Sequence, residues 1–136
     1  MKRRNFIRRT GHITVAAVAG GVVAGCSDAP SKDSSLQTGE ILHTVIFDLK
    51  HPASSPEAKK FLEDGTRILT AIPGVRNFQA LRQCSPKNDY TYGFLMKFDS
   101  QAEFDAYTAH PDHCRFVKER WETEVTRFQE SDFITP

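Results

Sequence analysis

The sequence predicts an α+β domain of the ferredoxin-like type, in which helices cover one face of a four-stranded antiparallel sheet. Three observations predict this class. A strand-like run comes first, two amphipathic helical regions follow, and three further strand-like runs are distributed between and after them. The resulting element order is β-α-β-β-α-α-β, within a chain long enough for one domain.

The first strand is predicted over residues 41–49, because this run is β-branched and aromatic. Its two faces are both largely apolar, so both need a covering layer. Ser54 and Glu57 then form a predicted capping box, and Pro56 suits the first helical turn. Apolar residues at helical spacing continue to Ile72, and the helix is predicted to end at Pro73-Gly74.

The second half of the domain is predicted as two strands, a two-part helix and a last strand. The strands cover 75–84 and 90–98, with a Ser, Pro, Asn and Asp turn between them. Ser100 opens a short helix through Tyr107. His110-Pro111-Asp112 then restarts the helix, and 127–134 forms the final strand.

The second face of the sheet has no predicted helix to cover it. Leu42, Thr44 and Ile46 lie on that face of the first strand. A second copy of the chain, related by a two-fold axis, is the simplest partner, and two sheets meeting face to face would close a homodimeric α/β barrel. We therefore expect a homodimer.

A separate segment precedes the domain. Arg3 and Arg4, followed by a short apolar run over 13–24, resemble a twin-arginine export signal, and 23–26 resembles a lipobox ending at Cys26. We predict a cleavable signal peptide over 1–25, a lipidated Cys26 with a flexible tether over 26–39, and the domain over 40–136. The alternative, an uncleaved membrane anchor, is disfavoured because 12 apolar residues are too few to cross a bilayer.

Composition and leader together predict a location and exclude one class of partner. After loss of the leader, 13 basic and 17 acidic residues remain, a net charge of −4, so we expect no nucleic-acid partner. Two acyl chains on Cys26 give stable membrane attachment. The domain is expected outside the cytoplasm, on the outer membrane if the organism has one, because serine follows the cysteine.

Four stretches of the domain resemble the stress-responsive dimeric α/β-barrel (Dabb) family. They are His43 to Phe47, Ile72 to Val75, Tyr107 to His113 with its Tyr…His-Pro-x-His pattern, and Ser131 to Phe133. The resemblance implies a ferredoxin-like fold, a homodimeric barrel and a cleft between helices and sheet. In a plant branch of the family, a tyrosine and a histidine that correspond to Tyr107 and His113 cyclise a polyketide. This chain has Tyr92 where that branch has another pocket histidine.

The residues themselves point to a polar cluster between helices and sheet. His43 and His113 are expected to approach one another there, with Tyr107 on the preceding turn. Imidazole and phenol groups suit general acid–base chemistry, and aromatic surroundings suit a small, flat, mostly apolar ligand. Further candidates for the pocket lining are Tyr92, His110, Phe116 and Val117.

Three alternatives remain open at this point. The domain binds a ligand without chemistry, or it is a cyclase-like lyase with Tyr107 and His113 as acid and base, or it is a structural module without a cavity. In the last case His43 and His113 form a satisfied core pair. His110, His113 and Cys114 also suggest a metal site, but His110 lies at the helix cap and no carboxylate is convincingly placed as a third ligand, so no metal and no cofactor is expected.

Overall fold

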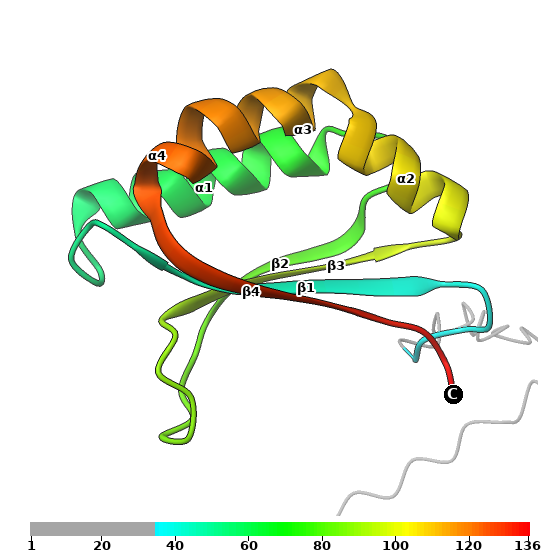
Figure 1. Cartoon of the computed structure of the whole chain (residues 1–136), viewed down its shortest axis with the longest axis horizontal. Coiled ribbons are helices and arrows are strands. Elements are labelled where there is room, and N and C mark those ends of the chain that lie inside the picture. Colours follow the sequence, from blue (N-terminus) through cyan, green and yellow to red (C-terminus); the bar gives the residue numbers. More distant parts are fainter. Residues whose placement is uncertain (1–34) are drawn as a thin grey trace, which may run out of the picture. The chain divides into compact units, whose positions relative to one another are not determined.

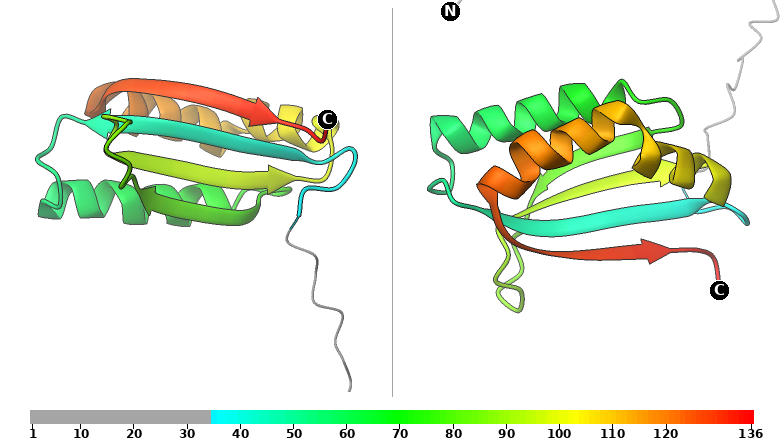
Figure 2. Two further views of the ribbon diagram at one scale, coloured as in Figure 1. Left: turned by 90° about the horizontal axis from the view of Figure 1, so that it is seen from below. Right: turned by 45° about the horizontal axis from the view of Figure 1, so that its top comes forward.

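The structure is a computed structural model that describes residues 35–136. Its four strands form one antiparallel sheet in the order β2-β3-β1-β4, and all helices lie on one face of that sheet (Figures 1 and 2). The predicted ferredoxin-like fold is confirmed. The elements are β1 (Ile41–Leu49), α1 (Pro56–Thr70), β2 (Arg76–Arg82), β3 (Tyr92–Phe98), α2 (Gln101–Ala109), α3 (Pro111–Phe116), the π-helical turn η1 (Val117–Trp121), α4 (Glu122–Glu124) and β4 (Val125–Phe133).

The predicted signal peptide, with Arg3 and Arg4, and the lipidated Cys26 lie outside the described residues, as does most of the tether. From residue 35 onward, no helix has both the length and the apolar character needed to cross a membrane.

Aromatic side chains fill the space between sheet and helices. Alternate residues of β1 and β3 point to this side, so Phe47 of β1 and Phe94 of β3 are buried together. Their ring centroids lie 4.9 Å apart, and Phe61 of α1 packs 5.9 Å from Phe47. Such ring pairs add to the stabilisation from buried apolar area. The core is therefore built largely from one row of each inner strand and the inner face of α1.

On the opposite face of the sheet, the described part of the chain places no helix. The register places Leu42, Ile46 and Leu95 on this face, together with Leu81 and Phe133. Leu81 is 43% exposed and Phe133 is 52% exposed. The sequence-based expectation of an uncovered apolar face therefore agrees with the sheet that the structure shows.

Local hydrogen bonds correct two predicted boundaries. The N-cap of α1 is Ser55, whose hydroxyl accepts from the Ala58 backbone N–H at 3.1 Å, so the predicted capping box with Ser54 is wrong. Ser54 instead has a φ of 63° and donates its N–H to the Tyr92 hydroxyl. Strand β2 ends at Arg82, not at Cys84; Gln83 still donates its backbone N–H to the Thr91 carbonyl, and its side chain donates to the Ser85 carbonyl in the following turn.

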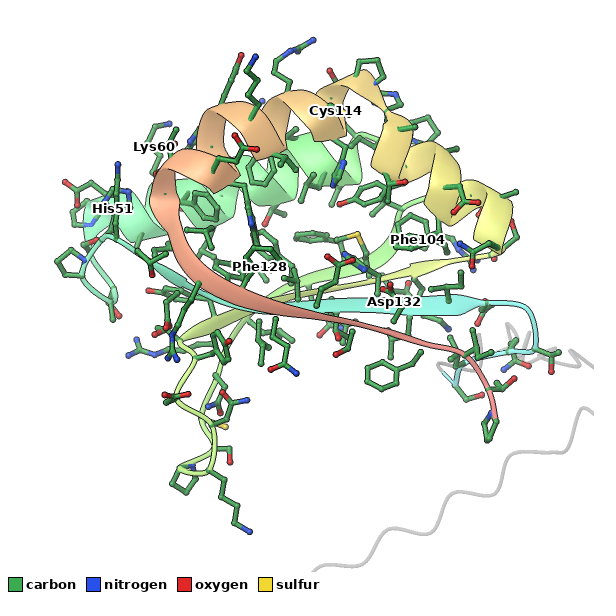
Figure 3. The ribbon with its side chains drawn as sticks, in the orientation of Figure 1. His51, Lys60, Phe104, Cys114, Phe128 and Asp132 are labelled. Carbon is green, nitrogen blue, oxygen red and sulfur yellow. The ribbon has the colours of Figure 1, made fainter. Side chains whose placement is uncertain are left out.

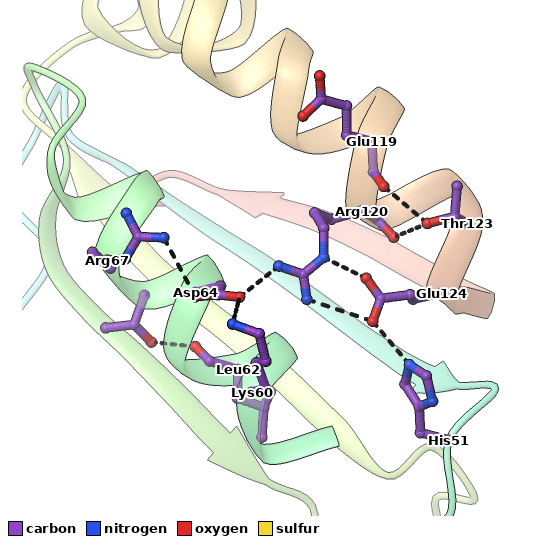
Figure 4. A network of polar contacts seen from close by, with 10 residues as sticks. His51, Lys60, Leu62, Asp64, Arg67, Glu119, Arg120, Thr123 and Glu124 are labelled. Atoms are coloured by element: carbon purple, nitrogen blue, oxygen red, sulfur yellow. Dashed lines mark hydrogen bonds and ion pairs between the residues drawn. The ribbon is translucent and has the colours of Figure 1, made fainter. Parts of the chain in front are cut away.

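An ion-pair network joins α1 to the last helical turn, η1 and α4 (Figure 4). The Arg120 guanidinium lies 2.7 Å from an Asp64 oxygen and 2.5 Å from a Glu124 oxygen. Glu124 also contacts His51 Nε2 at 2.8 Å, on the connection between β1 and α1. These bonds hold η1 and α4 against α1 and the β1–α1 connection, which fixes one wall of the cavity described next.

Candidate functional site

A cavity of about 270 Å³ lies between the sheet and the second helical region. Its sheet side comes from β1, β3 and β4, and its helical side from α1, α2, α3 and η1. The alternative of a solidly packed helix–sheet interface is therefore wrong. The lining residues are His43, Val45, Leu69, Phe94, Met96, Tyr107, His113, Phe116, Val117, Trp121, Phe128 and Glu130.

His43 is a buried imidazole held by the neighbouring strand. The register pairs His43 of β1 with Asp132 of β4, and His43 Nδ1 lies 2.6 Å from Asp132 Oδ1. Glu130, two residues earlier on the same face of β4, places Oε1 3.7 Å from the same nitrogen. Figure 3 shows Asp132, Phe128 and Phe104 on the helix-facing side of the sheet. With Nδ1–H donating to Asp132, Nε2 is left as an acceptor.

Tyr107 lies in the last turn of α2 with its ring fully covered. The ring centroid is 5.0 Å from that of Phe98 and 4.5 Å from that of His113. Within residues 35–136, the Tyr107 hydroxyl makes no hydrogen bond to protein, yet no fully buried side-chain oxygen there lacks a partner. The hydroxyl oxygen therefore keeps some accessible surface, and Tyr107 lines the cavity. Burial, and secondarily the charge of Glu130, raises the pKa of Tyr107 well above its usual value, so the phenol keeps its proton.

His113 reaches the cavity because the helix is interrupted. His110 ends α2 and begins α3, where its imidazole accepts from the Asp112 backbone N–H at 3.2 Å. His113 is half-buried, and its Nδ1 lies 3.0 Å from the Thr108 carbonyl oxygen. Burial lowers the pKa of His113 more than this hydrogen bond raises it. The neutral imidazole is therefore the form present near neutral pH.

The structure brings most, but not all, of the predicted residues together. His43, Tyr107, His113, Phe116 and Val117 line the cavity. The two histidines bond to Asp132 and to a backbone carbonyl rather than to each other, and their rings both pack against Tyr107.

Two predicted lining residues lie elsewhere. Tyr92 pairs with Phe47 in the sheet register and bonds to Ser54 near the start of α1, away from the cavity. His110 serves as a helix cap. Sequence reasoning missed Glu130 and Asp132, whose alternation with Phe128 on β4 was the available signal.

One group of three side chains has the residue types of a metal site. Single ligand atoms of His43, Glu130 and Asp132 lie within 4.8 Å of one another. This is a different set from the His110, His113 and Cys114 group considered above. The 2.6 Å separation of His43 and Asp132 is a hydrogen-bond distance, so a shared proton explains their contact without a metal ion.

A match to a known family model identifies the family to which this domain belongs. The family model described as "Stress responsive A/B Barrel Domain" (Dabb) matches residues 41–135, which is more than two thirds of the chain. The chain belongs to the Dabb family. The match begins with β1 and includes all helices and strands of the domain, so both the cavity and His43–Asp132 belong to the Dabb domain. No curated protein matches the chain significantly.

Solved structures support the same assignment. A Dabb protein of Mesorhizobium loti with a ferredoxin-like fold is 50% identical, with a TM-score of 0.71, and the match covers 73% of this chain and 99% of that one. Hydroxynitrile lyase of Passiflora edulis is 16% identical, with a TM-score of 0.64 and coverage of 74% and 97%. A dimeric ferredoxin-like protein of Thermobifida fusca is 18% identical, with a TM-score of 0.61 and coverage of 76% and 97%. The last two show a shared fold alone.

Proposed function

We propose that this Dabb domain binds a small, mostly apolar molecule in the cavity between sheet and helices. The observation that supports this most directly is Tyr107, which lines the cavity and whose hydroxyl has no hydrogen-bond partner among residues 35–136. A hydroxyl in a mostly apolar pocket has few other groups to bond, so a bound molecule that displaces water and accepts this hydrogen bond would be favoured. Apolar and aromatic side chains form most of the remaining wall.

Tryptophan fluorescence offers a direct test, because Trp121 is the single tryptophan of the chain and lines the cavity. We expect acetophenone, a flat aromatic carbonyl compound, to change this fluorescence saturably. Tyr107→Phe should weaken binding about tenfold through loss of one hydrogen bond. Tyr90→Phe, outside the cavity, is the matched control. Binding that is absent, or unchanged in Tyr107→Phe, would contradict the proposal.

Acid–base catalysis of the lyase type is a second candidate, because Tyr107 and His113, whose ring centroids lie 4.5 Å apart, are in complementary protonation states. Tyr107 retains its proton, while His113 is neutral and can accept one, as required for a general acid and a general base. The cyclase-like activity implied by the plant branch and the hydroxynitrile lyase fold relative belong to this class.

Exchange of the acetophenone methyl protons for deuterium in D₂O would report such proton transfer. His113→Gln should abolish the exchange while the protein still binds acetophenone. Binding without any exchange by the unaltered protein would refute the catalytic candidate and leave the binding proposal intact.

We further propose that the domain is a homodimer, anchored by a lipid on Cys26 outside the cytoplasm and active in an envelope stress response. The uncovered sheet face with Leu42, Ile46 and Leu95 supports the dimer, as does the dimeric state of the Thermobifida fusca protein. Native mass spectrometry should find an assembly with twice the mass of one chain. Ile46→Lys, a charge on the uncovered face, should yield the monomer mass instead. The protein should incorporate a labelled fatty acid in cells, and Cys26→Ser should abolish this incorporation. Incorporation that persists in Cys26→Ser would refute the lipid anchor at Cys26.

A further inference from the structure

The mouth of the cavity has a negative charge that no lysine or arginine of residues 35–136 neutralises. Glu130 lines the cavity and is about half exposed, and Asp132 lies two residues further along the same face of β4. Among the residues that the structure describes, the side chain of His43 is the partner of both carboxylates. Even a protonated His43 would leave one unit of negative charge.

Aromatic rings stand beside these carboxylates. Trp121 and Phe128 meet edge to face with their centroids 5.6 Å apart, and Phe94 lies 6.3 Å from Trp121. All three rings line the cavity together with Glu130. Aromatic faces attract cations, tryptophan most strongly, and the attraction grows when the cation is removed from water. Ring walls with a carboxylate at the opening are therefore complementary to an organic ammonium group.

The same arrangement disfavours anionic ligands. A carboxylate in the cavity would lie close to the charge of Glu130 in a partly desolvated space, where like charges repel more strongly than in water. The negative field extends into the cavity, since the charge of Glu130 contributes to the raised pKa of the Tyr107 phenol. His113 does not offset this field, because burial favours its neutral form.

We infer that the cavity selects a small organic cation, an amine attached to an aromatic or apolar body, over a neutral or anionic molecule of the same shape. The inference rests on the proposed binding function and specifies its ligand class. In this arrangement the apolar body lies in the cavity against Phe94 of the sheet and Phe116 of α3, and the ammonium group lies between Glu130 and the Trp121–Phe128 ring pair. Glu130 is then the residue that determines specificity.

Three probes of matched shape test this selection on the full chain: 2-phenylethylamine, 2-phenylethanol and 3-phenylpropionate. At pH 7 they are cationic, neutral and anionic. Trp121 fluorescence gives each Kd, with EDTA present so that metal ions do not occupy the carboxylates. We expect the amine to bind about tenfold more tightly than the alcohol, and the carboxylate to bind most weakly.

Glu130→Gln should remove the advantage of the amine over the alcohol and improve binding of the carboxylate. Glu119→Gln, an exposed position of η1 that does not line the cavity, should leave all three Kd values unchanged. Equal Kd values for the three probes, or an amine preference that survives Glu130→Gln, would overturn the inference while the binding function stands. Failure of all three probes and of acetophenone would overturn both.

Discussion

Replacing Gly65 by alanine would place a methyl group against two rings that line the cavity. Gly65 is buried in α1, and a Cβ at this position would lie 3.0 Å from Phe94 Cζ and 3.2 Å from Phe116 Cζ. Both distances are shorter than ordinary van der Waals contact, so at least one ring must move. The direction of the stability change therefore reports whether these rings have space to move.

The magnitudes of the competing effects are similar. Alanine is about 1 kcal/mol more favourable than glycine inside a helix. Overpacking a rigid core costs about 1–3 kcal/mol, so fixed rings would leave Gly65→Ala destabilised by up to about 2 kcal/mol. Phe94 and Phe116 border a cavity of about 270 Å³, so a shift of a few tenths of an ångström is available to them. We expect a net change within about 1 kcal/mol of zero.

Urea unfolding followed by circular dichroism measures this change through the midpoint, provided that the slope stays constant. Thr70→Ala, at an exposed position of the same helix, controls for helix propensity and should stabilise the domain by about 0.5 kcal/mol. The displaced rings should also narrow the cavity and weaken acetophenone binding. A loss near 2 kcal/mol, or stabilisation with unchanged binding, would refute the idea that the rings relax into the cavity.

Two further predictions concern pH. The Lys60, Arg120 and Arg67 side chains lower the pKa of Asp64 to about 2, so its ion pairs contribute stability above pH 4 that is lost as the pH falls towards 2. Asp64→Asn should cost about 1 kcal/mol at pH 7, allowing for solvent screening, and the difference from the unaltered protein should shrink in acid; a constant difference in urea unfolding would contradict this. The pKa of His113 is lowered by burial, so the unfolded chain binds a proton more readily, and stability should fall as the pH drops below 6.5. His113→Gln should reduce the slope of unfolding free energy against pH in that range, and an unchanged slope would show that His113 does not titrate as described.

Periodicity predicted the fold because each element has a strong local signal. The run from Ile41 to Leu49 alternates between core and open face along its whole length, and the structure places β1 at those residues. Ser100 caps α2 as the sequence indicates, with its hydroxyl accepting from Glu103 N–H. These features depend on neighbours in the chain, so the sequence reports them directly.

The site was harder to predict because it depends on register between distant strands. Alternation shows that Tyr92 points to the helical side, but the pairing of Phe47 with Tyr92 decides that it lies at the far end of the sheet from His43. The same limitation hid Asp132, which meets His43 across 89 positions of sequence. Glu130 and Asp132 stand two positions apart on the core-facing side of β4, which is unusual and was the available signal. Without the strand register, the sequence could not show that His43 is their partner.

The junction at His110-Pro111 determines which side chains can share a site. In an unbroken α-helix, residues 107 and 113 would be separated by about 120° around the axis, on different sides of the cylinder. The change of direction between α2 and α3 brings the rings of Tyr107 and His113 to a centroid distance of 4.5 Å. Proline at position 111 is compatible with this bend, because a first-turn proline needs no backbone hydrogen bond. A substitution that straightened this junction would separate Tyr107 from His113 in space, although both residues would still be present in the sequence.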